Sequence, residues 1–212
     1  MNVNKKDFDK EAANWDETPG RVKLAHDIAR AMMDIDIIKS DMNVLDFGCG
    51  TGLLTLQLQP LVRSITGVDS SAGMLEVLRS KIESHKLTNV RTQLLDVEAG
   101  DHLEGAYDLI VSSMTLHHIK DITGLFNQFQ QIMNAHGYLC LADLDSDDGR
   151  FHTSNEGVFH FGFDRDNMRQ TLEEAGFDVL DLQTAAEVIK EIPDGTHAFK
   201  IFLISAYNRA AN

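Results

Sequence analysis

Three glycines at alternate positions, Gly48, Gly50 and Gly52, follow a short apolar run that ends in Asp46 and Phe47. Glycine is favoured where a backbone turns with positive φ or approaches another group closely, and it weakens a helix or strand that contains it. Three glycines in five residues are therefore typical of a loop that wraps around a bound ligand. A phosphate, a dinucleotide or another nucleoside would each suit such a loop.

The spacing of the glycines distinguishes between these candidate ligands. A P-loop has the pattern G-x-x-x-x-G-K-[ST], whose lysine contacts phosphates, and this loop has no lysine. A dinucleotide site has the pattern G-x-G-x-x-G, whereas the third glycine here comes one residue early, in G-x-G-x-G. No cationic group stands in the loop to bind a pyrophosphate, so both phosphate-binding patterns are disfavoured.

The elements that must position this loop alternate along the chain. Short apolar runs predict seven strands, at 43–47, 64–69, 90–96, 107–113, 138–144, 177–189 and 197–208. Apolar residues at helical spacing predict helices between them, from Pro19 after a Thr18 cap, at 53–59 and 71–85, from Ile122 to near Gly137, and from an Asp164 cap to Gly176. This order predicts an α/β fold with a doubly wound, mostly parallel, Rossmann-like sheet that has helices on both faces. Ligands of such sheets bind beyond the carboxyl ends of the strands, where the glycine loop lies.

Composition limits the partners and the compartment. The chain has 212 residues and a formal net charge of -14, with no cationic run, which disfavours nucleic acid and anionic membranes as partners. With three prolines, no repeat and no low-complexity segment, residues 1–212 are expected to form a single domain. Two cysteines are too few for a disulfide scaffold, and no apolar run approaches the roughly 18 residues of a membrane span. We expect a cytoplasmic protein, either a monomer or a homodimer.

The glycine motif and its flanking strands resemble those of the class I S-adenosylmethionine-dependent methyltransferases. Their first motif, an apolar strand followed by D/E-x-G-x-G-x-G, is matched by residues 46–52, and "YDLIVSSMTLHHI" matches their fourth-strand motif. The closest resemblance is to small-molecule methyltransferases of the quinone-biosynthesis-like group (methyltransferase types 11 and 12), and to relatives that open with "F-D-x-x-A-x-x-W-D", here residues 8–16. The resemblance implies S-adenosylmethionine as the cofactor and one antiparallel strand near the C-terminus.

The resemblance also implies roles for acidic residues at the strand ends. Asp69 is expected on the ribose hydroxyls, Asp96 on the adenine amino group with Val97 against the ring, and Asp46 as a water-linked partner of the methionine ammonium. Each role has a plainer alternative. Asp69 can cap the helix at 71–85, although Ser70 or Ser71 can do so instead, and the other two acids can be local caps or turn residues.

Residues 1–38 are expected to form a helical lid over the cofactor. Trp15 is the only tryptophan, and it is expected either in this lid or as a surface anchor for the first long helix. The predicted cofactor-binding residues are Trp15, Asp46, Gly48, Cys49, Gly50, Gly52, Asp69, Ser70, Met74, Asp96, Val97 and Ser112.

The catalytic candidates are His117, His118 and Asp143. Histidine is the usual general base near neutral pH, but "LHHI" occurs in these relatives whatever their substrate, so one histidine is expected to be turned inward and hydrogen-bonded for structure. The acidic segment 143–152, with His152 and His160 nearby, is open to three interpretations: a solvated loop, a subsite for a cationic substrate, or a metal site. It has no recognised ligand spacing, and we predict no metal.

The predicted function is transfer of a methyl group to a small-molecule acceptor that is neutral or cationic. The fourth-strand loop reads "SSMT" rather than [DNS]-P-P-[YFW], which disfavours methylation of amide or exocyclic amino nitrogens. Two alternatives stay open: a nicotinamide-dependent oxidoreductase on a Rossmann fold, and a non-catalytic S-adenosylmethionine-binding protein.

Overall fold

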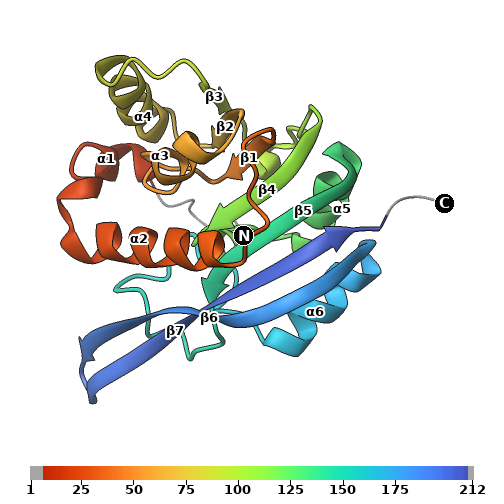
Figure 1. The fold of residues 1–212 in the computed structure, drawn as a ribbon. Coiled ribbons are helices and arrows are strands. Elements are labelled where there is room, and N and C mark those ends of the chain that lie inside the picture. The colour runs from red at the N-terminus through yellow and green to blue at the C-terminus, as the bar shows by residue number, and fades with distance from the viewer. Residues whose placement is uncertain (1–6, 210–212) are drawn as a thin grey trace.

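The computed structural model describes residues 7–209, in which seven strands form one sheet in the order β3-β2-β1-β4-β5-β7-β6 (Figure 1). The predicted lid therefore lies partly outside the described residues, since its first six residues are not included. The strands are β1 Asn43–Phe47, β2 Ser64–Asp69, β3 Val90–Leu94, β4 Tyr107–Ser113, β5 Met133–Leu144, β6 Phe177–Ile192 and β7 Gly195–Asn208.

The sheet is parallel from β3 through to β5, and β7 runs antiparallel to both of its neighbours, β5 and β6. The predicted mostly parallel, seven-stranded sheet with one antiparallel strand near the C-terminus is confirmed. The strand order reverses between β1 and β4, because β2 and β3 extend to one side of β1 and β5 extends to the other side of β4. Ligands of doubly wound sheets bind at such a reversal point.

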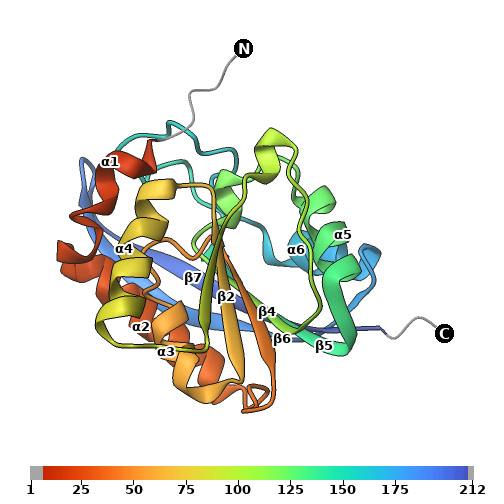
Figure 2. The same cartoon turned by 90° about the horizontal axis from the view of Figure 1, so that it is seen from above.

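Helices cover both faces of this sheet. Figure 2 shows α2 Pro19–Asp34, α3 Thr55–Leu58 and α4 Ala72–Ser84 on one side, and α5 Ile122–Ile132 and α6 Arg165–Glu174 on the other. The short helix α1 Phe8–Ala12 lies beside α4. Four single turns of 3-10 helix complete the elements: η1 Trp15–Glu17, η2 Gln59–Leu61, η3 Val97–Ala99 and η4 Leu116–His118.

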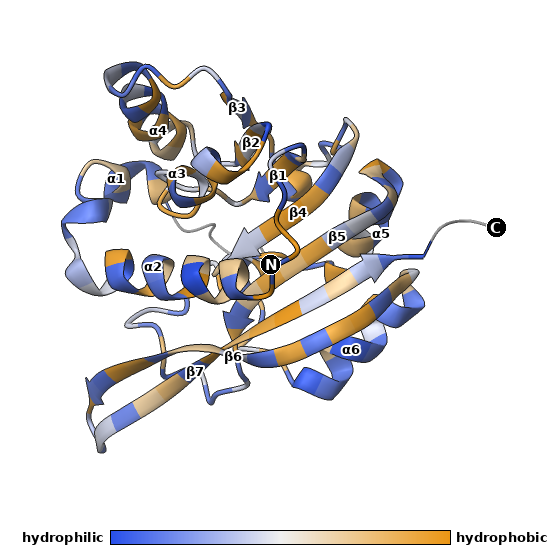
Figure 3. Ribbon diagram, viewed as in Figure 1, coloured by the Kyte–Doolittle hydropathy of each residue, from blue (hydrophilic) through white to orange (hydrophobic). Residues whose placement is uncertain are grey.

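Two main clusters of buried side chains hold the helices to the sheet. Phe126 and Phe129 of α5 are fully buried in one cluster with Ile110 of β4. Ile28 of α2 is buried in the other with Leu109, the neighbouring residue of β4. Successive β4 residues thus point to opposite faces, as the period of two in a strand requires. Figure 3 shows the result, with apolar strands in the centre and polar residues on the outer sides of the helices.

Several predicted boundaries are wrong. The last two strands are longer than predicted, since β6 runs on to Ile192 and β7 already begins at Gly195. The strand expected at 138 begins at Met133, directly after α5, and passes Gly137 as a strand residue. The helix expected at 53–59 is only one turn of α-helix, followed by the 3-10 turn that contains Pro60, which lacks the N–H a longer helix would need. The third strand ends at Leu94, two residues early.

The two predicted helix caps have different outcomes. The Asp164 side chain accepts a hydrogen bond from the backbone N–H of Asn167 (2.9 Å), so this cap is confirmed. Thr18 occupies the N-cap position of α2, but its side chain makes no capping hydrogen bond.

Candidate active site

The glycine loop leaves the carboxyl end of β1 at the point where the strand order reverses. The backbone N–H groups of Gly48 and Cys49 both donate to the carbonyl oxygen of Val68 on β2 (2.8 and 3.0 Å), so the loop folds back toward that strand. Gly48 and Gly50 have φ of +72° and +53°, a left-handed conformation that favours glycine. The predicted tight turn after the first strand is therefore present.

The three glycines differ in what surrounds them. A Cβ added to Gly48 would lie 2.2 Å from side-chain atoms of Thr115, and one added to Gly52 would lie 2.4 Å from a methyl carbon of Leu78, so both are packed against the protein. A Cβ added to Gly50 would meet nothing within 4 Å. The loop therefore presents its backbone at Gly50 to open space, where a guest has room to approach.

Asp69, at the end of β2, holds this loop in place. Its Oδ2 accepts a hydrogen bond from the Gly50 N–H (2.8 Å) and its Oδ1 accepts one from the Ser71 N–H (2.8 Å). Ser71 is the N-cap of α4, since its hydroxyl oxygen accepts a hydrogen bond from the N–H of Met74 (3.1 Å). The capping role considered for Asp69 is thus performed by Ser71, and a half-buried carboxylate lies beside the open space at Gly50.

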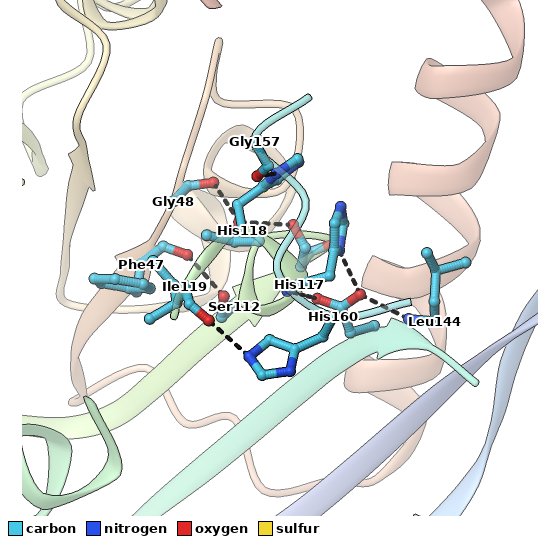
Figure 4. Close-up of polar contacts among 12 residues, drawn as sticks. Phe47, Gly48, Ser112, His117, His118, Ile119, Leu144, Gly157 and His160 are labelled. Atoms are coloured by element: carbon cyan, nitrogen blue, oxygen red, sulfur yellow. Dashed lines mark hydrogen bonds and ion pairs between the residues drawn. The ribbon is translucent and has the colours of Figure 1, made fainter. Parts of the chain in front are cut away.

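Asp46 and Ser112 are buried beneath the loop. Asp46 is 1% exposed, and its Oδ2 accepts a hydrogen bond from the Thr55 hydroxyl (2.6 Å). Burial raises the pKa of Asp46 to about 7, the negative charge of Asp69 adds to this shift, and the Thr55 hydrogen bond opposes it. The hydroxyl of Ser112 donates to the carbonyl oxygen of Phe47 (2.8 Å), which joins the carboxyl ends of β4 and β1 (Figure 4).

Three other predicted cofactor-binding residues lie in the glycine loop (Cys49), in the turn after β2 (Ser70) and in the first turn of α4 (Met74). Cys49 and Met74 are buried, and Ser70 is half-buried at the start of the turn into α4. Burial, together with the nearby charges of Asp46 and Asp69, raises the pKa of the Cys49 thiol well above its ordinary value. The Cys49 side chain therefore stays protonated and acts as a small apolar residue in this position.

The predicted adenine site lies at the end of β3. Asp96 is the N-cap of η3, where its Oδ1 accepts a hydrogen bond from the N–H of Glu98 (3.1 Å). Val97 is half-buried and packs against the apolar cluster on the α5 face of the sheet. The carboxyl ends of β1, β2, β3 and β4 thus bring the predicted glycine, ribose, adenine and Ser112 positions to one edge of the sheet.

The N-terminal segment is attached to this edge by two aspartates that were not among the predicted site residues. Oδ1 of Asp9 accepts hydrogen bonds from the Ser71 hydroxyl (2.5 Å) and the Gly73 N–H (2.8 Å) at the start of α4. Asp16 accepts one from the Thr51 hydroxyl (2.6 Å) and forms an ion pair with Lys81 (2.5 Å). Both aspartates belong to the "F-D-x-x-A-x-x-W-D" opening, which was the available signal.

Trp15 lies between aromatic and cationic side chains of the same segment. The Arg21 guanidinium stands 3.7 Å from the centre of the Trp15 ring, and the Phe8 ring packs edge-on at 5.9 Å. Phe8 also packs against His118, with 5.1 Å between ring centres. Trp15 therefore anchors the segment to α2 through Arg21, while Phe8 reaches the fourth-strand loop.

His117 and Asp143 form a buried pair at the carboxyl ends of β4 and β5. Nδ1 of His117 lies 2.6 Å from Oδ1 of Asp143, and the two residues are 1% and 0% exposed. Burial alone would raise the pKa of Asp143, but the charge and hydrogen bond of His117 and the N–H of Leu144 (2.7 Å, Figure 4) outweigh it and lower that pKa. Nε2 of His117 is buried and has no hydrogen-bond partner in the described part of the chain. The expected inward-facing histidine is therefore His117.

Further histidines surround this pair. The rings of His118 and His152 lie 4.1 and 4.9 Å from the ring of His117. Nδ1 of His118 donates to the carbonyl oxygen of Gly157 (2.7 Å), and Nε2 of His160 donates to that of Ile119 (2.9 Å), as Figure 4 shows. Within residues 7–209, no three His, Cys, Asp or Glu side chains are arranged to hold a metal ion.

The other acids of segment 143–152 have partners within the protein. Asp145 forms a two-pronged ion pair with Arg165 (2.7 and 2.8 Å). Asp147 accepts hydrogen bonds from the backbone of its own turn, including the Arg150 N–H (3.1 Å). Asp148 forms an exposed ion pair with the Arg150 side chain (3.2 Å). These contacts support the interpretation of a structured surface loop.

No helix in the described part of the chain is both long and apolar enough to cross a bilayer. Two shallow surface hollows lie away from the glycine loop, one between α2 and β6 and one beside α6. Their linings are mainly exposed charged and polar side chains with no buried polar group, so we place the functional site at the carboxyl edge of the sheet.

Known proteins resemble this chain over much of its length. A family model described as a methyltransferase domain matches residues 19–182. A malonyl-[acyl-carrier protein] O-methyltransferase from Acetivibrio thermocellus is 33% identical over 138 residues, which cover 64% of this chain and 47% of that protein. A ubiquinone biosynthesis O-methyltransferase from Vibrio parahaemolyticus is 24% identical over 204 residues, covering 93% of this chain and 74% of that protein. The chain spans about half the length of the curated relatives that it matches at 33% identity.

A solved structure supports the fold. The crystal structure of the YcgJ protein from Bacillus subtilis has a TM-score of 0.75 at 16% identity, covering 88% of this chain and 100% of that one. The matches confirm the predicted resemblance to class I S-adenosylmethionine-dependent methyltransferases and do not favour a nicotinamide oxidoreductase. Because the family model matches well over half of its residues, the chain belongs to the family of methyltransferase domains.

Proposed function

We propose that this protein transfers the methyl group of S-adenosylmethionine to a small-molecule acceptor. The observation that carries the proposal is the glycine loop at the reversal point of the sheet. Its backbone at Gly50 faces open space, and the carboxylate of Asp69 is fixed beside that space by the Gly50 N–H (2.8 Å). The match of the chain to the methyltransferase family supports the proposal that the methyl donor binds at this loop.

The residues at this edge match the chemistry of the donor. Its ribose carries two hydroxyl donors, which suit the carboxylate oxygens of Asp69, and its adenine amino group suits Asp96 with Val97 against the ring. The buried carboxyl of Asp46 is placed to interact through water with the ammonium of the methionine part, which would favour its charged form. When bound, S-adenosylmethionine supplies an electrophilic methyl group on a sulfonium, and the protein positions the acceptor and excludes water.

We further propose that residues 7–18 act as a lid over this site, within a single domain; the remainder of the predicted lid contains α2, which is fixed to the sheet by the buried side chains of Ile28, Ala29 and Met32. Asp9 and Asp16 attach the segment to the start of α4 and to the glycine loop through four hydrogen bonds or ion pairs of 2.5–2.8 Å. All of these contacts are polar and lie at the edge where the donor would enter. A segment held by a few polar contacts opens at lower cost than one buried in an apolar core.

The acceptor is a small molecule that offers an oxygen. Two of the relatives reported above are O-methyltransferases by name, which supports oxygen as the methylated atom. The net charge of -14 favours a neutral or cationic acceptor over a polyanion. The cytoplasmic location and the monomeric or dimeric state stay predictions.

Calorimetry tests the donor. We expect S-adenosylmethionine and S-adenosylhomocysteine to bind with micromolar dissociation constants, about -8 kcal/mol. NAD serves as the control ligand, and binding of NAD without either of the other two would contradict the proposal. A non-catalytic binding protein would bind both and yet turn over no member of an acceptor panel.

A further inference from the structure

The His117–Asp143 pair has the arrangement of an oriented base. Asp143 is completely buried and accepts three hydrogen bonds, from Nδ1 and the N–H of His117 (2.6 and 3.3 Å) and from the Leu144 N–H (2.7 Å). An ionised carboxylate only accepts hydrogen bonds, so the proton lies on Nδ1 of His117. In the neutral form of the ring, Nε2 then carries a lone pair, and this buried atom has no hydrogen-bond partner among residues 7–209.

The position of the pair connects it to the proposed donor site. Thr115 lies two residues before His117, and its hydroxyl donates to the carbonyl oxygen of Gly48 in the glycine loop (3.2 Å). The same threonine side chain occupies the space that a Cβ on Gly48 would need. The loop that faces the donor and the turn that carries His117 are therefore packed directly against each other.

The surroundings of Nε2 favour a flat, uncharged ring. Imidazole rings of His118 and His152 lie 4.1 and 4.9 Å from the His117 ring, and Phe8 and Phe151 pack edge-on against these two at 5.1 and 4.9 Å. Aromatic side chains stack well on another planar ring. Stacking of an acceptor ring on His117 requires the His152 ring, which belongs to the loop between β5 and α6 rather than to the sheet, to move aside.

We propose that His117, oriented by Asp143, is the general base of the reaction and that the acceptor carries a hydroxyl on an aromatic ring. This inference rests on the proposed function. The acceptor O–H bond breaks and its proton moves to Nε2 of His117, while the oxygen bonds to the methyl carbon and the C–S bonding pair returns to sulfur, leaving S-adenosylhomocysteine. An aromatic hydroxyl is acidic enough for an imidazole to act on it as a general base.

The first experiment compares two acceptors of the same shape and different acidity. Catechol and 4-nitrocatechol are supplied with S-adenosylmethionine at pH 8, where only the nitro compound is largely ionised. In His117→Gln we expect the catechol rate to fall by about 100-fold or more, as for loss of a general base, and the 4-nitrocatechol rate to fall less than about tenfold. His26→Gln, an exposed histidine on α2, is the matched control and should leave both rates unchanged.

The second measurement does not depend on turnover. 4-Nitrocatechol is titrated into the wild-type complex with S-adenosylhomocysteine at pH 6, and the absorbance of its ionised form is followed. We expect the ionised form to appear on binding to the wild-type protein and to be absent with His117→Gln. The melting temperature of the variant, expected to be lowered because a buried pair is changed, shows whether it folds, and an unchanged S-adenosylhomocysteine affinity shows that its donor site is intact.

The outcomes separate this inference from the proposed function. Failure of S-adenosylmethionine to bind the wild-type protein would overturn the proposed function itself. Binding without methylation of either catechol, or equal rate losses on the two, would overturn the inference and leave the proposed function standing. If His117→Gln does not fold, the wild-type titration alone decides, because bound 4-nitrocatechol that stays un-ionised rules out a base at this position.

Discussion

Replacing Asp46 with asparagine should remove a loss of folding stability that the wild-type protein undergoes as the pH rises. The Asp46 carboxyl is 1% exposed, and it accepts hydrogen bonds from Thr55, whose hydroxyl lies at 2.6 Å. Its pKa of about 7 in the folded protein exceeds the ordinary value of 3.8 because burial disfavours the charged form. Asparagine keeps the size of the side chain and an oxygen to accept from Thr55, and it removes the titration.

The sign and size of the change in folding stability follow from the linkage between proton binding and folding. Between pH 4 and 7 the folded state holds the Asp46 proton and the unfolded state does not, so the stabilising effect of this proton is lost as the pH rises through the folded pKa. A difference of about 3 pH units is worth about 4 kcal/mol at 1.36 kcal/mol per unit. The stability of Asp46→Asn relative to the wild-type protein should therefore increase by about 2–4 kcal/mol from pH 4 to pH 8, with 4 as the upper limit.

Urea denaturation of the ligand-free proteins at pH 4, 6 and 8 measures this difference. Asp41→Asn, which changes an exposed acid just before β1, is the control and should run parallel to the wild-type protein at every pH. Saturating S-adenosylmethionine should reduce the pH effect, because a nearby ammonium favours the charged carboxylate. Parallel curves for Asp46→Asn and the wild-type protein without ligand would refute the reasoning.

Three further predictions concern the donor site and its lid. Asp69→Ala should weaken S-adenosylhomocysteine binding tenfold or more in calorimetry, since unpartnered hydroxyls and a released loop cost about 1–3 kcal/mol; an unchanged affinity would leave Asp69 with a purely structural role. The double variant Asp9→Asn, Asp16→Asn should weaken binding of the same ligand while the melting temperature without ligand changes by only a few degrees, and loss of the fold would instead make the segment part of the core. Gly50→Ala should reduce donor affinity at a stability cost of about 1 kcal/mol, whereas Gly48→Ala should destabilise the protein by more than about 2 kcal/mol because its Cβ would lie 2.2 Å from a neighbouring side chain. A larger stability loss for Gly50→Ala than for Gly48→Ala in thermal denaturation would contradict the geometry.

Local patterns were sufficient to predict most of the sheet. The strands at 43–47 and 64–69 have the predicted bounds, because each is a short apolar run that ends at a turn. The start of β5 was missed because the residues from Met133 to Gly137 contain no strand-like alternation. They become a strand because they follow α5 directly and pair with β4 at Tyr107. That pairing is a tertiary contact, and no local pattern reports it.

The site was predictable in its residue types but not in its pairings. His117 and Asp143 were both candidates, yet their contact depends on the adjacency of β4 and β5, which brings together residues 26 positions apart. Asp145 was considered for a cationic substrate, whereas the structure pairs it with Arg165, 20 positions away. Charges at the ends of strands indicate where chemistry can occur, and the packing of the elements decides which of them meet.

The order of the last two strands has a consequence for synthesis. β7 lies between β5 and β6, and within residues 7–209 β6 pairs with no other strand. The ribosome releases the 16 residues of β6 before the 14 residues of β7, so β6 has no strand partner until the following segment emerges. The sheet therefore completes only after β7 has emerged, when β7 pairs with β6 across a two-residue turn and with β5 on its other side. Translation that stalls before β7 would leave both edges open to other nascent chains, which makes this segment the point at which aggregation competes with folding.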